Sequence, residues 1–298
     1  MHMVFPYLGA LLFCASYAAS VPNPDNTICT PTGSIPSDNN KLIFIANAWN
    51  ATPQGFQCIS VNSYSTAFNA TWQWPSDRNA VHSYPHVKFQ PKLLPIVISD
   101  ISAVTLSASW SISAPAKDLD SRITGMVSNV AWDMFADEDP AAAQVDASAK
   151  YEVMVWVGRY GDPKPIGFSS GLCQNQTVTV GDTSFSLYCG STSSGSRNLT
   201  TYSWVANSNV STSHIDFLQL LKPLVDNNLL ASSLSLGVIG FGSEAYYAPE
   251  NVTFMAQDFG VNLTSKTRGS EAASLGLDMM HTKFLAMIMV ACHVFLSL

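Results

Sequence analysis

The sequence predicts an all-β protein built as a sandwich or jelly roll, and two observations lead to this prediction. Short runs rich in β-branched and aromatic residues follow one another along residues 42–261, with turn-forming residues between them. The stretch between the two unusual chain ends, residues 21–265, is long enough for one all-β domain with a sizeable core. The sequence contains no long internal repeat and no internal linker, so we predict a single domain.

Twelve segments are predicted to be strands, because each is enriched in residues that fit a pleated, half-buried surface. In chain order they are Leu42–Trp49, Gly55–Tyr64, Ala67–Trp74, Val81–Phe89, Ile101–Ser113, Gly125–Phe135, Tyr151–Val157, Gly171–Thr179, Thr183–Cys189, Thr200–Ala206, Leu234–Tyr246 and Val252–Val261.

One segment departs from this pattern and is predicted to form a short helix from Ser213 to Asn227. Its apolar residues recur at helical spacing, and Ser213 and Asp216 have the spacing of a capping box. Pro223 should end or kink this helix, because proline lacks the backbone donor that a helix interior needs.

The two ends of the chain predict targeting segments rather than folded structure. In residues 1–20, the apolar stretch Val4–Tyr17 precedes Ala18-Ala19-Ser20, which is typical of a secretory signal peptide. Residues 266–298 hold a polar spacer and the apolar tail Phe284–Leu298, the layout of a glycosylphosphatidylinositol (GPI) attachment signal. The alternative is a membrane-spanning anchor, but this tail would reach only about 22 Å as a helix, against roughly 30 Å of hydrocarbon. We therefore favour a lipid anchor at the cell surface or wall.

The cysteines agree with a secreted protein. Four remain between the predicted signal and tail, Cys29, Cys58, Cys173 and Cys189, and four cysteines allow three pairings. Short loops favour the pairs Cys29–Cys58 and Cys173–Cys189. No spacing suggests a metal site, and no cofactor is expected.

Seven Asn-x-Ser/Thr motifs also fit an extracellular glycoprotein. Their asparagines are Asn50, Asn69, Asn175, Asn198, Asn209, Asn251 and Asn262. Charged residues make up 12% of the chain and the net charge is −7, which argues against nucleic acid as a partner and is compatible with a neutral polymer. A monomer is the default expectation.

Three acidic residues stand inside apolar, strand-like segments: Asp133, Glu152 and Glu244. A charge in such a setting costs free energy unless it is paired or has a task. For Glu152 alone a buried ion pair is the simpler interpretation, but three such acids favour a site. The acids at 137–139 are interpreted as a solvated turn, and Glu250 as a surface residue.

Side chains alternate between the two faces of a strand, so the segment 151–157 divides into two sets. Tyr151 and the three valines of this segment are predicted to face the core. Glu152, Met154 and Trp156 share the opposite face, which we interpret as the floor of a cleft. Sugar rings offer apolar faces that stack on indole, so Trp49 or Trp156 in such a cleft would suit a β-glucan. Other strand tryptophans, including Trp72, Trp74 and Trp204, are individually expected in the core.

Several motifs resemble those of glycoside hydrolase family 12. The run Tyr151-Glu152-Val153-Met154-Val155-Trp156 is similar to the nucleophile motif of that family. Five further segments resemble the family over roughly residues 41–262: Asn47-Ala48-Trp49, Val81-His82-Ser83-Tyr84-Pro85, Val130-Ala131-Trp132-Asp133-Met134-Phe135, Gly161-Asp162-Pro163-Lys164-Pro165-Ile166-Gly167 and Gly240-Phe241-Gly242-Ser243-Glu244.

The resemblance implies a β-jelly-roll sandwich of two antiparallel sheets with a concave substrate cleft, and a retaining endo-β-1,4-glucanase acting on β-1,4-glucan or xyloglucan. It implies that Glu152 is the nucleophile, Glu244 the general acid/base and Asp133 a residue that supports the nucleophile. Implied substrate contacts are Asn47, Trp49, Met154 and Trp156 on the glycone side, and Pro165 and Ile166 on the other. A non-catalytic β-glucan-binding surface protein is the alternative function, although two close carboxylates that repel would give a binding module no advantage.

Four positions depart from the family pattern without removing a carboxylate. Trp132 stands where tyrosine is usual, His82 where lysine is common, Ala245 in place of proline, and Asn50 often in place of glycine. The departures bear on substrate preference, and a glycan on Asn50 beside Trp49 would narrow the cleft.

Overall fold

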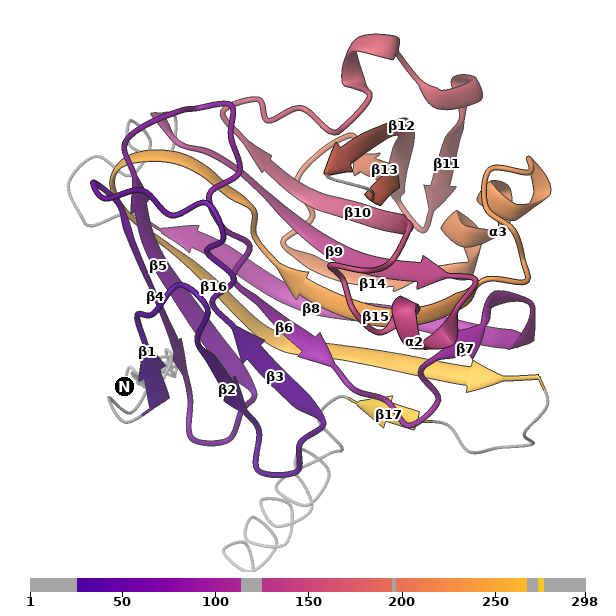
Figure 1. Ribbon diagram of the computed structural model, residues 1–298, viewed down its shortest axis with the longest axis horizontal. Coiled ribbons are helices and arrows are strands. Elements are labelled where there is room, and N and C mark those ends of the chain that lie inside the picture. The colour runs from indigo at the N-terminus through magenta and orange to yellow at the C-terminus, as the bar shows by residue number, and fades with distance from the viewer. Residues whose placement is uncertain (1–25, 114–124, 195–196, 267–272, 276–298) are drawn as a thin grey trace, which may run out of the picture.

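Two curved β-sheets enclose one hydrophobic core and share a long strand, β16 (Ala245–Ser265), as Figure 1 shows. The computed structural model describes residues 26–113, 125–194, 197–266 and 273–275. Strand β16 begins beside one sheet, where Ala245 pairs with Ser128, and then continues along the other sheet. The expected all-β sandwich is confirmed.

The first sheet is antiparallel and lies opposite the cleft. Its strands, in spatial order, are β1 (Thr27–Ile28), β4 (Phe56–Val61), β5 (Ala67–Trp74), β16, β8 (Ile101–Ser113) and β14 (Thr212–Asp216), while β17 (Ala273–Leu275) pairs with the end of β16. The strand β17 falls within the predicted spacer.

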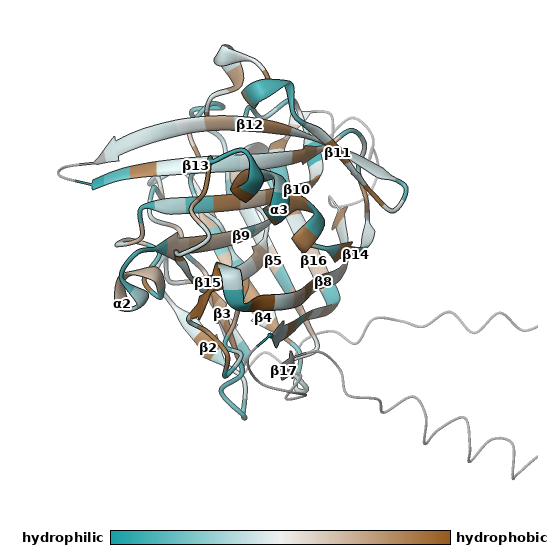
Figure 2. Ribbon diagram, turned by 90° about the vertical axis from the view of Figure 1, so that its right-hand side faces the viewer, coloured by the Kyte–Doolittle hydropathy of each residue, from teal (hydrophilic) through white to brown (hydrophobic). Residues whose placement is uncertain are grey.

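The second sheet carries the cleft. Its strands, in spatial order, are β2 (Ser34–Pro36), β3 (Leu42–Ile45), β6 (His86–Phe89), β15 (Ser235–Gly242), β9 (Val127–Asp137), β10 (Tyr151–Tyr160), β13 (Arg197–Ala206), β12 (Thr183–Ser194) and β11 (Thr177–Val180), with β7 (Ile96–Val97) also on β15. One pairing, β10 with β13, is parallel. Figure 2 shows β12, β13, β10, β9 and β15 stacked in this order.

The burial of each strand follows from its place in the sandwich. Strand β5 alternates between half-buried and buried residues, because one face lies on the core and the other is solvated. Strand β9 is buried along its whole length, because one face packs in the main core and side chains of neighbouring elements pack on the other. Its sequence therefore shows no alternation. The valines of the 151–157 segment pack in the core as predicted, and Met154 and Trp156 lie on the opposite face.

The helical prediction was correct in its second half and wrong in its first. Helix α3 spans Leu218–Asp226, whereas residues 212–216 form β14, paired with β8. Ile215 fitted the helical spacing, but its side chain is buried from a strand. Pro223 neither ends α3 nor marks its boundary. The buried leucines Leu220, Leu221 and Leu224 pack on the core, and this packing holds the helix together around the proline.

Several strand boundaries also differ from the prediction; the strand expected over 81–89, for example, is β6 and starts only at His86. The strand expected over 171–179 starts only at Thr177, because residues 168–170 and 173–175 form the short 3-10 helices η3 (Phe168–Ser170) and η4 (Cys173–Asn175). The strand expected over 234–246 is interrupted at Ser243 and Glu244, between β15 and β16. A third 3-10 helix, η2 (Ile98–Asp100), precedes β8.

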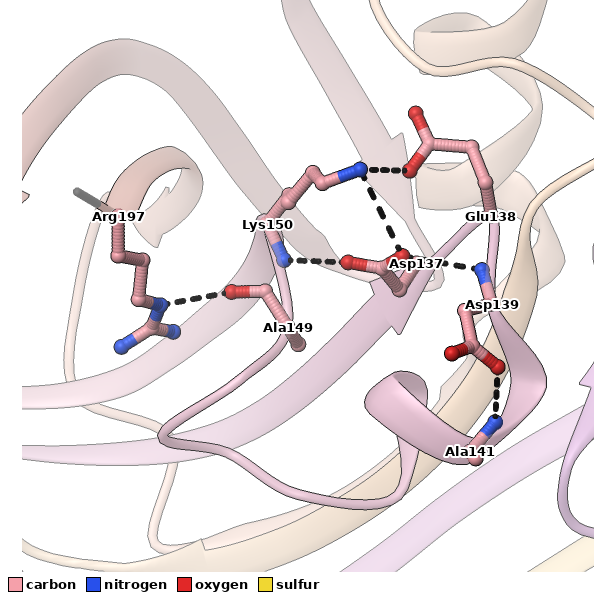
Figure 3. Close-up of polar contacts among 7 residues, drawn as sticks. All are labelled: Asp137, Glu138, Asp139, Ala141, Ala149, Lys150 and Arg197. Carbon is pink, nitrogen blue, oxygen red and sulfur yellow. Dashed lines mark hydrogen bonds and ion pairs between the residues drawn. The ribbon is translucent and has the colours of Figure 1, made fainter.

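The interpretation of the acids at 137–139 as a solvated turn is correct for Glu138 and Asp139, which are exposed, and wrong for Asp137. Asp137 ends β9 and is only 2% exposed, and its carboxylate accepts backbone N–H bonds from Asp139 and Lys150 at 3.0 Å each. Asp139 caps the short helix α2 (Pro140–Ala143) by accepting a bond from the Ala141 N–H. Figure 3 shows this cluster. The spacing of the three acids gave no sign of the cap, because α2 is a single turn.

Both favoured disulfides are confirmed, Cys29–Cys58 and Cys173–Cys189. The predicted signal peptide and most of the predicted tail lie outside the described residues. In the part of the chain that is described, no helix is both long and apolar enough to cross a membrane.

Candidate active site

The floor of the cleft is set by the register of three adjacent strands. Residues paired across a sheet share a face, so Asp133 on β9 lies on the same face as its partners Met154 on β10 and Gly240 on β15. Glu152, two residues before Met154, therefore lies on this face as well. Gly240 has no side chain to fill the space above the floor, which keeps the cleft open beside Asp133.

Glu244 reaches the cleft from the break between β15 and β16. Here a side chain replaces the neighbouring strand as the hydrogen-bond acceptor of the backbone. The Oδ1 of Asn129 accepts a hydrogen bond from the Glu244 N–H at 3.0 Å. The Ser243 hydroxyl donates to the Asn129 carbonyl at 2.6 Å. This local arrangement breaks the strand and turns the Glu244 carboxyl toward the other two acids.

A cleft of about 550 Å³ contains all three acids. Of the residues predicted for the site, it is lined by Asn47, Trp49, Asp133, Glu152, Met154, Trp156, Ile166 and Glu244. Pro165 does not line it and is buried. Trp49 is 56% exposed, so its indole presents a large open apolar face. Trp156 lies in the floor, with its Nε1 donating to the Met154 sulfur at 3.4 Å.

Glu152 is surrounded by protein except where it opens to the cleft. Burial raises its pKa above the usual value, while a hydrogen bond from Thr201, the positive charge of Arg197 and hydrogen bonding with Asp133 lower it. The Thr201 hydroxyl donates to Glu152 Oε2 at 2.6 Å. These three groups favour the ionised carboxylate, the form in which it is nucleophilic.

Glu244 differs from Glu152 in that a neighbouring negative charge adds to the effect of burial. Burial and the nearby charge of Glu152 raise its pKa from 4.5 to about 7, although hydrogen bonds from Asn129 and Tyr246 lower it in part. The Asn129 amide and, at 3.3 Å, the Tyr246 hydroxyl both donate to Glu244 Oε2. A carboxyl group with a pKa near 7 can give up and take back a proton at neutral pH.

Asp133 is the most deeply enclosed of the three acids, at 8% exposure. Burial first, and then the charges of Glu152 and Glu244, raise its pKa well above the usual value. These effects favour the protonated form of Asp133, which can donate a hydrogen bond to the Glu152 carboxylate. Burial therefore raises the pKa of all three acids, and Glu152 differs from the other two because a threonine hydroxyl and an arginine both support its charged form.

Two other groups shape the cleft next to the acids. His86 on β6 stacks on Tyr84 with ring centroids 4.7 Å apart, and its Nδ1 lies 2.7 Å from the Tyr84 carbonyl oxygen. Burial lowers the pKa of His86 to about 4, so its ring is neutral near pH 7. The Tyr84 hydroxyl donates to the Ala131 carbonyl at 3.0 Å. Within the described residues, no cluster of three or more histidines, cysteines or acids is arranged to hold a metal ion.

Two of the four departures from the family pattern point away from the cleft. Trp132 is fully buried against Phe241, with ring centroids 4.7 Å apart. His82 is buried beneath Asn50 and stacks on Trp74. Asn50 is exposed beside Trp49, and Ala245 is buried at the start of β16. The other predicted core tryptophans, Trp72, Trp74 and Trp204, are fully buried.

Four residues that touch or influence the acids were not identified from the sequence: Asn129, Arg197, Thr201 and Tyr246. A signal existed for Tyr246, which stands two positions after Glu244. Thr201 and Arg197 become neighbours of Glu152 only through the parallel pairing of β10 with β13. Of the seven predicted glycosylation asparagines, six are exposed and Asn69 is half-buried on β5.

Comparison with known proteins places this cleft in a family. The family model for glycosyl hydrolase family 12 matches residues 40–264. The chain is 28% identical over 261 residues to the probable xyloglucan-specific endo-beta-1,4-glucanase A of Aspergillus fumigatus, covering 85% of this chain and 98% of that protein. It is 28% identical over 210 residues to the xyloglucan-specific endo-beta-1,4-glucanase A of Emericella nidulans, covering 69% and 79%.

Solved structures agree with the family match. Endoglucanase 3 of Trichoderma harzianum, from family GH12, superposes with a TM-score of 0.65 at 29% identity, covering 80% of this chain and 97% of that one. The catalytic domain of Humicola grisea Cel12A in complex with a thio cellotetraose shares the fold, with a TM-score of 0.67 at 24% identity, covering 80% and 99%. The sequence match and the jelly-roll fold agree, and the chain belongs to glycosyl hydrolase family 12 as a glycoside hydrolase.

Proposed function

We propose that this protein is a secreted, retaining endo-β-1,4-glucanase that hydrolyses β-1,4-glucan or xyloglucan of plant cell walls. The observation that carries the proposal is the pair Glu152 and Glu244 in one cleft, the first with hydrogen bonds and a nearby cation that support its charged form and the second with a pKa of about 7. Glycoside cleavage needs one ionised and one protonated carboxyl across the scissile bond. The relatives are named as xyloglucan-specific endo-β-1,4-glucanases, which supports the substrate class.

In the first step Glu152 attacks the anomeric carbon and forms a covalent ester with the sugar. Glu244 gives its proton to the leaving glycosidic oxygen, so the departing chain carries a neutral hydroxyl. Asp133 and Thr201 hold Glu152 by hydrogen bonding, which directs its free oxygen at the substrate. Trp49, which is 56% exposed, offers an apolar face to a sugar ring of the glycone side, whereas Trp156 is only 2% exposed and contributes to the floor beneath it.

In the second step a water molecule replaces the leaving chain. The ester has removed the negative charge of Glu152, and that charge is one of the causes that raise the pKa of Glu244. The pKa of Glu244 therefore falls, and its carboxylate is ready to take a proton from the water as the water attacks the anomeric carbon. Two displacements at this carbon retain its configuration. A sugar hydroxyl in place of water would give transglycosylation.

Secretion and anchoring are part of the proposal. Two disulfides are compatible with an oxidising compartment outside the cytosol, and the exposed sequon asparagines are compatible with N-glycosylation. Release of the protein from intact cells by a phosphatidylinositol-specific phospholipase would support the lipid anchor. Retention after this treatment, with extraction by detergent alone, would contradict it.

The activity is tested with the purified protein on xyloglucan and on unbranched β-1,4-glucan. We expect reducing ends to appear with at least one polymer, and Glu152→Gln to lower kcat by about a thousandfold or more, because covalent catalysis depends on this carboxylate. Glu138→Gln, an exposed acid outside the cleft, is the matched control and should leave kcat unchanged. Undiminished activity of Glu152→Gln would refute the assignment.

A further inference from the structure

Two cationic side chains, Lys150 and Arg197, lie at the starts of β10 and β13, and their charges are compensated differently (Figure 3). The Lys150 ammonium lies 2.8 Å from a Glu138 carboxylate oxygen and 3.9 Å from one of Asp137. Its charge is therefore compensated by two acids at the protein surface. Arg197, the first residue of β13, belongs to no such pair.

The Arg197 guanidinium is held by backbone carbonyls instead of acids. Its Nε donates to the Ala149 carbonyl at 2.9 Å, and its Nη2 to the Asp146 carbonyl at 2.6 Å. Neutral acceptors fix the group in place without cancelling its charge. Among the described residues, no carboxylate lies within ion-pair distance of it, and the side chain lines the cleft. A fixed, uncompensated positive charge therefore faces the acids.

The same strand supplies a second group four residues later. Strand β13 runs parallel to β10 with Thr201 opposite Glu152, which brings the threonine hydroxyl to 2.6 Å from Glu152 Oε2. Thr201 is fully buried, so water cannot replace it as a donor. Strand β13 thus presents a charge and a hydrogen bond to the same carboxylate.

Other titratable or charged groups that line the cleft around Glu152 come from every neighbouring element. They are Asp133 on β9, Glu244 after β15, Tyr84 before β6, His86 on β6, Tyr246 on β16, and Asp146 and Lys164 in loops. Of these, Asp133 lowers the pKa of Glu152 by hydrogen bonding, and His86 is uncharged near pH 7. Lys164 is paired with Asp162 at 2.6 Å. Arg197 is left as the uncompensated cation.

We propose that Arg197 and Thr201 are positioning residues that keep Glu152 ionised and aimed at the substrate, and that β13 thereby sets the acidic limit of activity. Arg197 and Thr201 both lower the pKa of Glu152, and neither contributes to the raised pKa of Glu244. The two limbs of the pH profile should therefore respond separately. This inference rests on the proposed function, because it concerns the same nucleophile.

The test compares pH profiles of kcat/KM for four variants with that of the wild type. Arg197→Met removes the charge, Arg197→Lys keeps it, and Thr201→Val removes the hydroxyl at constant shape. Arg159→Met is the charge-matched control, since Arg159 is seven residues along β10 from Glu152, roughly 23 Å at the usual rise.

We expect Arg197→Met to shift the acid limb to higher pH, with kcat/KM about threefold lower or more below the optimum and an unmoved alkaline limb. Thr201→Val should lower kcat/KM about tenfold on the acid side, because a hydrogen bond to a charged group is lost. Arg197→Lys should restore most of the acid limb, and Arg159→Met should match the wild type.

A purely structural role for Arg197 predicts another pattern and would overturn the inference. In that case Arg197→Met and Arg197→Lys would lower kcat by the same factor at every pH, with neither limb displaced. An acid limb that moves equally in Arg159→Met would also overturn it, since net charge alone would then be the cause. If the wild type hydrolyses no glucan, the proposed function fails before this comparison begins.

Discussion

Replacing Glu244 by glutamine should stabilise the folded protein at alkaline pH. Burial and the charge of Glu152 raise the pKa of Glu244 to about 7, against 4.5 for an unperturbed glutamic acid. Below about pH 4.5 the carboxyl is protonated in both the folded and the unfolded chain. Between about pH 4.5 and 7 the unfolded chain releases this proton while the folded chain keeps it, so the free energy of unfolding falls as the pH rises through this range. Glutamine has no proton to lose and avoids this loss.

The magnitude follows from the two pKa values. A pKa difference of about 2.5 corresponds to about 3 kcal/mol, at 1.36 kcal/mol per unit, and this is an upper value because Glu244 keeps some exposure to the cleft. For a domain of this size, 1 kcal/mol corresponds to about 2–4 °C in Tm. We therefore expect Glu244→Gln to melt up to about 6–12 °C above the wild type at about pH 9, and close to it at about pH 4.

Thermal unfolding followed by circular dichroism across this pH range is the assay. Glu138→Gln is the control, because Glu138 is exposed and its pKa is lowered by its hydrogen bond to Lys150. The control should show no gain at alkaline pH. A Glu244→Gln gain that is absent, or equal at every pH, would refute the reasoning, because the raised pKa would then not be a property of the folded state.

Four further outcomes follow from individual contacts. Tyr246→Phe removes a hydroxyl that donates to Glu244 Oε2 at 3.3 Å and lowers its pKa, so the alkaline limb of kcat/KM should move to higher pH, and an unmoved limb would contradict this role. Gly242→Ala would place a Cβ 2.2 Å from the Pro85 carbonyl oxygen and should cost about 1–3 kcal/mol or more in unfolding measurements. In Gly240→Ala the added Cβ would lie 3.1 Å from its nearest neighbour, His86 Cδ2, so this variant should fold and should instead raise KM by filling the cleft floor. Equal destabilisation of the two glycine variants would contradict the geometry. Replacing Cys173 and Cys189 by alanine removes a disulfide with a sequence separation of 16 and should lower the free energy of unfolding by about 3 kcal/mol. The measurement is a fall in Tm, which the wild type should show only after reduction.

The acids of the site could be predicted from the sequence because their surroundings are local. Glu152 and Asp133 each interrupt an apolar strand, and an acid in such a run is conspicuous in the sequence itself. The alternation of a strand then placed Met154 and Trp156 beside Glu152. The roles of the acids came from the family resemblance, since spacing alone does not distinguish a nucleophile from an acid.

The groups that tune these acids could not be predicted in the same way, because their contacts depend on chain topology. Thr201 meets Glu152 through a parallel pairing of two strands that are separated by two other strands in the sequence. Asn129 lies on β9, and its side chain contacts Glu244 only because β15 ends beside it. The start of α3 was misplaced for a related reason. Ile215 fits a helical repeat and a strand equally well, and only the pairing with β8 decides between them.

The most direct test of the central claim is to trap the covalent intermediate. A 2-fluoro β-glucoside substrate with a good leaving group slows both steps, and mass spectrometry of the digested protein locates the attached sugar. We predict a single adduct on the peptide that contains Glu152, together with a first-formed product of unchanged anomeric configuration by NMR. An inverted product, or an adduct on any residue other than Glu152, would contradict the account.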